Sequence, residues 1–109
     1  MNVQKVENIK NASEFELKHV PKIEVPEEYQ LNEEIEVKIT VGEIMHVMTA
    51  EHYIKWIELY KNGELVDHVD LSPSDKPIAV FKINLDGSDR LMAREECNLH
   101  GLWESEKVV

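Results

Sequence analysis

The sequence predicts an all-β domain, an antiparallel sandwich or barrel, and three observations support that fold class. Apolar and polar residues alternate over short segments, turn residues separate those segments at intervals of about 8–12 residues, and no long stretch has a competing helical period. The chain has 109 residues, of which 42% are hydrophobic. That length suits one domain, and that composition suffices for one hydrophobic core.

The clearest strand signals lie in the middle of the chain. Residues 35–41 alternate isoleucine and valine with charged or polar residues, which predicts a strand with one buried face. Residues 53–60 are rich in aromatic and β-branched side chains and predict a second strand, although their apolar positions also fit a helical spacing. Asn62-Gly63 is a strong hairpin-turn signal, so residues 65–71 are expected to return as the next strand.

The remaining elements follow from the same signals. Residues 78–85 predict a strand that Asp86-Gly87 closes, and two further strands are expected at 90–95 and 102–108. Residues 1–15 are polar and are expected to form an N-terminal arm, either loose or partly helical. The folded domain is then expected to cover residues 16–109.

Charge and hydropathy exclude several classes of partner. The net charge is −10, with 22 acidic residues against 12 basic ones. Nucleic acids and anionic membranes are disfavoured, because both attract basic patches. No apolar run approaches the roughly 20 residues that span a bilayer, and the N-terminus lacks the hydrophobic core of a signal peptide. We therefore expect a cytoplasmic protein with no nucleic-acid or membrane partner.

Histidines and the single cysteine form the most specific chemical signal. Cys97 and His100 are separated by two residues, His46 and His52 flank five residues, and His19 lies near the start of the chain. A soft thiolate with several imidazoles favours iron, copper or zinc over magnesium or calcium. Because a sandwich brings strand-end loops together, these residues are a plausible five-ligand set for a transition metal. A buried structural thiol is the alternative for the cysteine.

Three sequence blocks resemble those of superoxide reductases. Residues 46–57 read HVMTAEHYIKWI and resemble the family's His-Pro-Met-Thr-x-Glu-His-Tyr-Ile-x-Trp-Ile block. Residues 97–103 read CNLHGLW and resemble its Cys-Asn-x-His-Gly-x-Trp block. Residues 18–21 read KHVP and resemble its Glu-Lys-His-Val-Pro loop. The blocks occur in the family's order, and the resemblance covers residues 17–107.

The resemblance implies a fold, a cofactor and an activity. The fold would be an immunoglobulin-like sandwich of about seven strands, and the activity the one-electron reduction of superoxide to hydrogen peroxide. The implied cofactor is one iron with four equatorial histidines and an axial thiolate, which by position are His19, His46, His52, His100 and Cys97. Lys18 matches the family's active-site lysine, whose cation attracts superoxide or orients a proton-delivering water.

The resemblance also implies partners and a subclass. Some family members carry a second iron domain with four cysteines, whereas this chain has one cysteine in total. It therefore resembles the single-iron class, called neelaredoxin. The expected electron donor is a rubredoxin-like protein, and the expected assembly is a homo-oligomer, a tetramer or a dimer.

Two positions depart from the family pattern, and one histidine lies outside it. Leu17 stands where the family has a glutamate that caps the iron, and the adjacent Glu16 would point the other way in an extended segment. Val47 replaces the family's proline. His68 lies in the middle of a predicted strand and is expected to be solvated.

Electrostatics and the competing metal sites give further expectations. Lys18, Lys22 and Lys55 lie near the predicted ligands in sequence and are expected to form a local positive patch despite the acidic chain. A blue-copper electron carrier is one alternative, but no methionine follows His100 to act as its weak axial ligand. A non-catalytic sandwich with a structural zinc is another.

Overall fold

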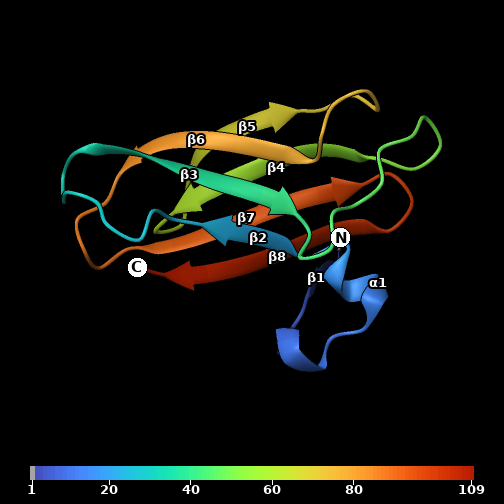
Figure 1. Ribbon diagram of the computed structural model, residues 1–109, viewed down its shortest axis with the longest axis horizontal. Helices are drawn as coiled ribbons and strands as arrows, with labels where there is room; N and C mark the ends of the chain where they lie inside the picture. Colours follow the sequence, from blue (N-terminus) through green and yellow to red (C-terminus); the bar gives the residue numbers. More distant parts are fainter. Residues whose placement is uncertain (1) are drawn as a thin grey trace.

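The computed structural model describes residues 2–109, which form two β-sheets packed face to face (Figure 1). The larger sheet has the strand order β1-β8-β7-β4-β5, and the smaller sheet has the order β2-β3-β6. The strands are β1 (Val3–Lys5), β2 (Pro21–Glu24), β3 (Glu34–Val41), β4 (Ile54–Lys61), β5 (Glu64–Asp70), β6 (Ile78–Asn84), β7 (Arg90–Cys97) and β8 (Gly101–Val108).

The sheet order is that of an immunoglobulin-like sandwich. Strands β4, β7 and β8 take the places of C, F and G, with β5 added at the edge, while β2, β3 and β6 take the places of A, B and E. The expected fold class is confirmed, with eight strands over residues 2–109 where the family resemblance implied about seven. The eighth is β1, which pairs in parallel with β8.

The strands predicted from alternation are confirmed. The segment 35–41 lies within β3, and the segment predicted from its aromatic content forms β4 rather than a helix. The turn between β4 and β5 places Asn62 at φ 52° and Gly63 at φ 87°, a left-handed conformation that asparagine and glycine adopt readily.

The core lies between the two sheets, where alternate residues of β3, β4, β6 and β7 meet. Its largest completely buried side chains include Ile39 of β3, Ile57 and Leu59 of β4, and Leu91 of β7. This two-layer packing fixes the positions of the strand ends and hence of the loops that connect them.

Strands β1 and β2 were not predicted, whereas the N-terminal segment was expected to be loose or partly helical. The segment expected as an arm contains β1, a 3₁₀ turn, η1 (Ile9–Asn11), and the start of α1 (Glu14–Leu17). A capping box begins α1, because Ser13 accepts from the Glu16 amide while the Glu16 carboxylate accepts from the Ser13 amide. Within residues 2–109, no helix has the length and hydrophobicity needed to cross a membrane.

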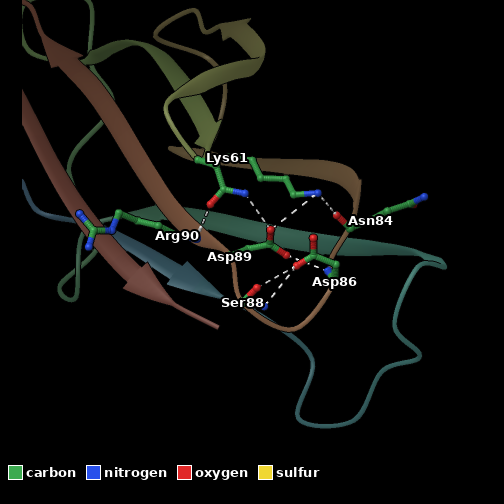
Figure 2. Close-up of polar contacts among 7 residues, drawn as sticks. Lys61, Asn84, Asp86, Ser88, Asp89 and Arg90 are labelled. Carbon is green, nitrogen blue, oxygen red and sulfur yellow. Dashed lines mark hydrogen bonds and ion pairs between the residues drawn. The ribbon is translucent and has the colours of Figure 1, made fainter.

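At one end of the sandwich, a polar corner built on Asp89 links the β4–β5 turn to the loop between β6 and β7 (Figure 2). The Asp89 carboxylate is completely buried and accepts hydrogen bonds from the Asn62 side chain and the Asp86 amide, each at 2.8 Å. The Lys61 ammonium lies 3.9 Å from the same carboxylate and donates to the Asn84 carbonyl at 2.6 Å.

The opposite end of the sandwich gathers three segments that are distant in sequence. Strands β3 and β7 end there, while β2, β4 and β8 begin there, so their connections lie side by side with α1 (Figure 1). These connections, together with the last residue of β7, carry all five predicted metal ligands.

Candidate metal centre

The predicted ligands converge at this end of the sandwich. Potential ligand atoms of His19, His46, His52 and Cys97 all lie within 4.8 Å of one another. The fifth residue, His100, places its Nδ1 atom 3.1 Å from Nε2 of His19 and 3.8 Å from Sγ of Cys97. The structure therefore brings all five together.

Backbone carbonyls orient two of the imidazoles. Nδ1 of His19 donates to the Phe15 carbonyl at 2.6 Å, and Nδ1 of His46 donates to the Val47 carbonyl at 2.6 Å. A carbonyl accepts only, so each ring carries its proton on Nδ1 and leaves the Nε2 lone pair free to face the cluster. The rings are thus fixed in the tautomer that a metal ligand needs.

His52 provides the clearest sign that the cluster fits a metal. Its Nε2 atom is buried and finds no hydrogen-bond partner within residues 2–109. A buried polar atom without a partner is costly, and a metal ion would satisfy it. The donor set of one thiolate and several imidazoles suits iron, copper or zinc.

Cys97 lies at the inner side of the cluster. The residue is 1% exposed, and its sulfur lies 3.6 Å from Nε2 of His46. The backbone of Leu99 and His100 acts on the thiol in the direction that lowers its pKa, but burial outweighs it. Burial raises the pKa of the thiol above its ordinary value, so without a cation the sulfur holds its proton.

Burial also favours the neutral form of His19, His46 and His52. It lowers the pKa of His46 from 6.5 to about 4, and it lowers the pKa values of His19 and His52 below 6.5. The neighbouring imidazoles act in the same direction, because like charges disfavour one another. Neutral imidazoles are the form that binds a metal, so these groups are ready to act as ligands at neutral pH.

Two side chains outside the predicted ligand set, Asn98 and Trp103, hold the loops in place. The Asn98 side chain accepts from the Tyr53 amide at 2.9 Å and donates to the Glu51 carbonyl at 3.0 Å, which joins the β7–β8 turn to the loop before β4. The Trp103 ring stacks on the His19 ring, with 5.0 Å between centroids. Asn98 and Trp103 both belong to the sequence block that resembles the family, and this was the signal available for them.

A cavity of about 420 Å³ opens over the imidazoles. All four predicted histidine ligands line it, together with Glu14, Phe15, Lys18 and Val47. Cys97 is not among the lining residues, so the ring of imidazoles separates the sulfur from the cavity. A small ligand entering the cavity therefore meets the cluster on the side away from the thiol.

The expected positive patch does not form as three free cations. Lys18 lines the cavity but lies 3.1 Å from the Glu14 carboxylate. Lys55 pairs with Glu96 at 3.0 Å, and Lys22 lies within 4 Å of two carboxylates. Two of these partners are distant in sequence: Glu96 of Lys55 comes from the neighbouring strand β7, and Glu43 of Lys22 from the loop after β3. Glu24 lies on β2 itself, two residues after Lys22.

The first turn of α1 decides which acidic group reaches the cavity. The Glu16 side chain is committed to the Ser13 cap, with its Oε1 atom 3.0 Å from the Ser13 amide. Leu17 contributes its carbonyl to the Ile44 amide at 3.1 Å and does not line the cavity. Glu14, one turn before Lys18, is the carboxylate that does.

His68 takes no part in this cluster. It lies on β5 and bridges two carboxylates, with Nδ1 2.7 Å from Glu58 and Nε2 2.7 Å from Asp70. Hydrogen bonds to these carboxylates raise the pKa of His68 above 6.5. The side chain is therefore an ion-paired surface group rather than a freely solvated one.

Comparison with known proteins places this site in a family. The family model described as desulfoferrodoxin matches residues 11–106. The chain belongs to the desulfoferrodoxin family. The match runs from α1 through most of β8 and includes all five clustered residues.

Relatives within the desulfoferrodoxin family match over most of their lengths. A desulfoferrodoxin homolog of Archaeoglobus fulgidus is 41% identical over 101 residues, which cover 93% of this chain and 72% of the relative. A putative superoxide reductase of Methanocaldococcus jannaschii is 36% identical over 108 residues, which cover 95% of this chain and 92% of the relative.

A solved member of the family has the same fold. The superoxide reductase (neelaredoxin) from Ignicoccus hospitalis superposes with a TM-score of 0.82 at 32% identity, covering 98% of this chain and 93% of that one. The family resemblance inferred from three sequence blocks is confirmed, as is the sandwich architecture.

Proposed function

We propose that this protein is a superoxide reductase that converts superoxide to hydrogen peroxide by one-electron reduction. The observation that carries the proposal is the arrangement of four imidazoles around the inner end of an open cavity, with a buried thiol behind them. The proposed ligands of one iron per chain are His19, His46, His52, His100 and Cys97. Iron bound there would supply the electron that superoxide takes up.

The donor set favours iron over the competing metals. Structural zinc is almost always held by four ligands in a tetrahedron, whereas five donors converge here. A blue-copper site uses two histidines, one cysteine and a weak axial ligand, often methionine. The sulfur of Met48, the methionine between the two histidines of its segment, instead accepts from the Ile54 amide at 3.4 Å.

Lys18 is the proposed catalytic side chain at the mouth of the cavity. Its ammonium would attract the superoxide anion, and the attraction is stronger where the anion is partly shielded from water. The Lys18 side chain is 41% exposed and its charge is offset by Glu14 at 3.1 Å, so the attraction is moderate. The open cavity gives solvent access for the two protons that hydrogen peroxide requires.

Glu14 is proposed to supply the acidic group that the family places at the position of Leu17. Support comes from its place in the cavity wall beside Lys18 and the four imidazoles. Glu16 is the weaker candidate, because its carboxylate caps α1. Glu14 would then have two roles: it offsets the charge of Lys18, and it provides a carboxylate beside the clustered imidazoles.

The electron donor is proposed to be a small rubredoxin-like protein that docks at the cavity mouth. Two apolar side chains that line the cavity are largely exposed, Phe15 at 45% and Val47 at 50%, and such contacts suit a transient redox partner. A homo-oligomer, dimer or tetramer, is proposed from the family resemblance, and light scattering of the purified protein tests it. A reducing cytoplasm is the proposed compartment, because it keeps a free thiol available as a ligand.

The activity is tested on purified protein loaded with iron. We expect about one iron per chain, an absorption band in the red from charge transfer between thiolate and oxidised iron, and consumption of superoxide with peroxide as product in pulse radiolysis. Cys97→Ser is the matched control: it retains the four imidazoles but should lose the red band. An intense blue copper protein, or a colourless zinc protein without superoxide consumption, contradicts the proposal.

A further inference from the structure

The N-terminal strand reaches the metal centre through one side chain. Strand β1 pairs in parallel with the beginning of β8, and Gln4 lies opposite Trp103 in this register. The Gln4 side chain extends toward the preceding turn, where its Nε2 atom donates to the His100 carbonyl at 2.7 Å. A residue near the start of the chain thus contacts the backbone of a proposed ligand 96 positions later.

The His100 carbonyl receives a second donor. Nε1 of Trp103 donates to it at 3.2 Å, and the Trp103 ring also stacks on His19. A carbonyl oxygen accepts two hydrogen bonds, so Gln4 and Trp103 together satisfy it. Gly101 follows at φ 81°, a left-handed conformation that glycine adopts readily, so the chain can reverse directly after this carbonyl.

The position of this peptide matters for the imidazole of His100. The ring atom that faces the cluster is Nδ1, which lies 3.1 Å from Nε2 of His19. Nδ1 is bonded to the ring carbon nearest the backbone, so its place follows the backbone of residue 100 more closely than that of Nε2 would. A displacement of the His100 backbone therefore carries this donor atom with it.

We propose that Gln4 is a positioning residue of the metal centre, which holds the His100 carbonyl and thereby sets the approach of the His100 Nδ1 atom to the metal. The inference rests on the proposed function only in taking His100 as a ligand. The N-terminal strand β1 would then help to position a metal ligand, through the hydrogen bond from Gln4 to the His100 carbonyl. Removing outer contacts of metal ligands typically weakens metal binding by about 10–100-fold.

The test compares variants of one strand by their affinity for cobalt(II), whose visible spectrum reports the coordination and the thiolate bond. Gln4→Met removes the donor and keeps an unbranched side chain of similar length. Gln4→Glu keeps the polarity, but its carboxylate cannot donate when ionised. Lys5→Met is the control, because it loses the 3.2 Å ion pair of β1 with Glu104 and makes no contact with His100.

Competition with a chelator then measures the cobalt dissociation constant of each loaded protein. We expect both Gln4 variants to bind cobalt about tenfold more weakly, with altered visible bands, and Lys5→Met to remain within about twofold of the unmodified protein. Gln4 variants that match the unmodified protein, or a Lys5→Met loss equal to theirs, overturn the inference alone. An unmodified protein that binds no cobalt through its thiolate overturns the proposed function and the inference together.

Discussion

The substitution Asp89→Asn removes the charge from the polar corner at the end of the sandwich remote from the metal centre and leaves the side chain nearly the same shape. In the native corner, two oxygen atoms accept from the Asn62 side chain and the Asp86 amide, both at 2.8 Å, with the Lys61 ammonium at 3.9 Å. An asparagine can accept only through its one oxygen, so its NH₂ group must face one of these donors.

The magnitude follows from those contacts. A hydrogen bond to a buried charged group contributes about 1.5–3 kcal/mol, and a buried donor left without a partner costs about 1–3 kcal/mol. Losing one such bond while stranding one donor therefore predicts a decrease of about 3 kcal/mol in the free energy of unfolding at pH 7. For 109 residues, an unfolding entropy of about 2.1 cal/mol/K per residue converts this decrease to a fall of about 13 °C in Tm.

The pH dependence gives a second signature. Burial alone would raise the pKa of Asp89, but the hydrogen bonds from the Asp86 amide and Asn62, together with Lys61, lower it below its ordinary value of 3.8. The group therefore contributes stability that is complete above pH 3.8 and is lost as the pH falls through the lower folded-state pKa. The difference between the native protein and Asp89→Asn should shrink in that acidic range.

Urea unfolding followed by tryptophan fluorescence measures both effects at equal metal content. Asp86→Asn is the control for charge removal in the same loop, because the Asp86 side chain is exposed and accepts from Ser88, whereas its backbone amide, which the substitution keeps, donates to Asp89. We expect the control to change the free energy of unfolding by under about 1 kcal/mol. Equal losses in the two variants, or a loss in Asp89→Asn that is the same at pH 7 and pH 2, would refute the reasoning.

Three further predictions concern the site, the core and the outer face of the larger sheet. Lys18→Ala should slow superoxide capture at low ionic strength in pulse radiolysis and Glu14→Gln should accelerate it, with both effects fading above about 0.1 M salt; salt-independent rates remove the two side chains from this role. Glu95 is completely buried, both its carboxylate oxygens lack hydrogen-bond partners within residues 2–109, and burial raises its pKa to about 9. Glu95→Met should therefore raise the free energy of unfolding, measured in urea at pH 7, by about 2 kcal/mol. A loss of stability would mean that the carboxyl group has a stabilising partner. Hydrogen bonds to Glu58 and Asp70 raise the pKa of His68, so the pairing contributes to the free energy of unfolding fully below pH 6.5, and this contribution is lost as the pH rises through the folded-state pKa. His68→Gln should flatten the pH dependence of the free energy of unfolding in that range, and an unchanged pH dependence contradicts the pairing.

Local sequence signals were sufficient for the long strands. Alternation placed β3, the aromatic content placed β4, and Asn62-Gly63 placed the hairpin, because each signal depends only on neighbouring residues. They did not reveal β1, whose three residues are stabilised by pairing with β8 at the other end of the chain. Strand β2 was also missed, since it is short, begins with Pro21 and pairs only with β3.

In the candidate site, too, some features could be predicted from the sequence and others depend on the tertiary structure. The five clustered residues were accessible from the sequence because they lie in blocks whose order and spacing resemble a known family. The pairing of Lys55 with Glu96 and the direction of Glu14 were not, because they depend on strand register and on where α1 begins. The bridge that His68 forms between two carboxylates could not be predicted either, since Glu58 comes from the neighbouring strand.

X-ray absorption spectroscopy of the iron-loaded protein tests the central claim most directly, because it identifies the metal and counts its sulfur and nitrogen neighbours in one measurement. We expect one sulfur neighbour and four imidazole nitrogens around iron, with the sulfur lost in Cys97→Ser and one imidazole lost in His100→Ala. An iron without a sulfur neighbour, or one whose surroundings are unchanged in both variants, would contradict the assignment of this cluster as the metal centre.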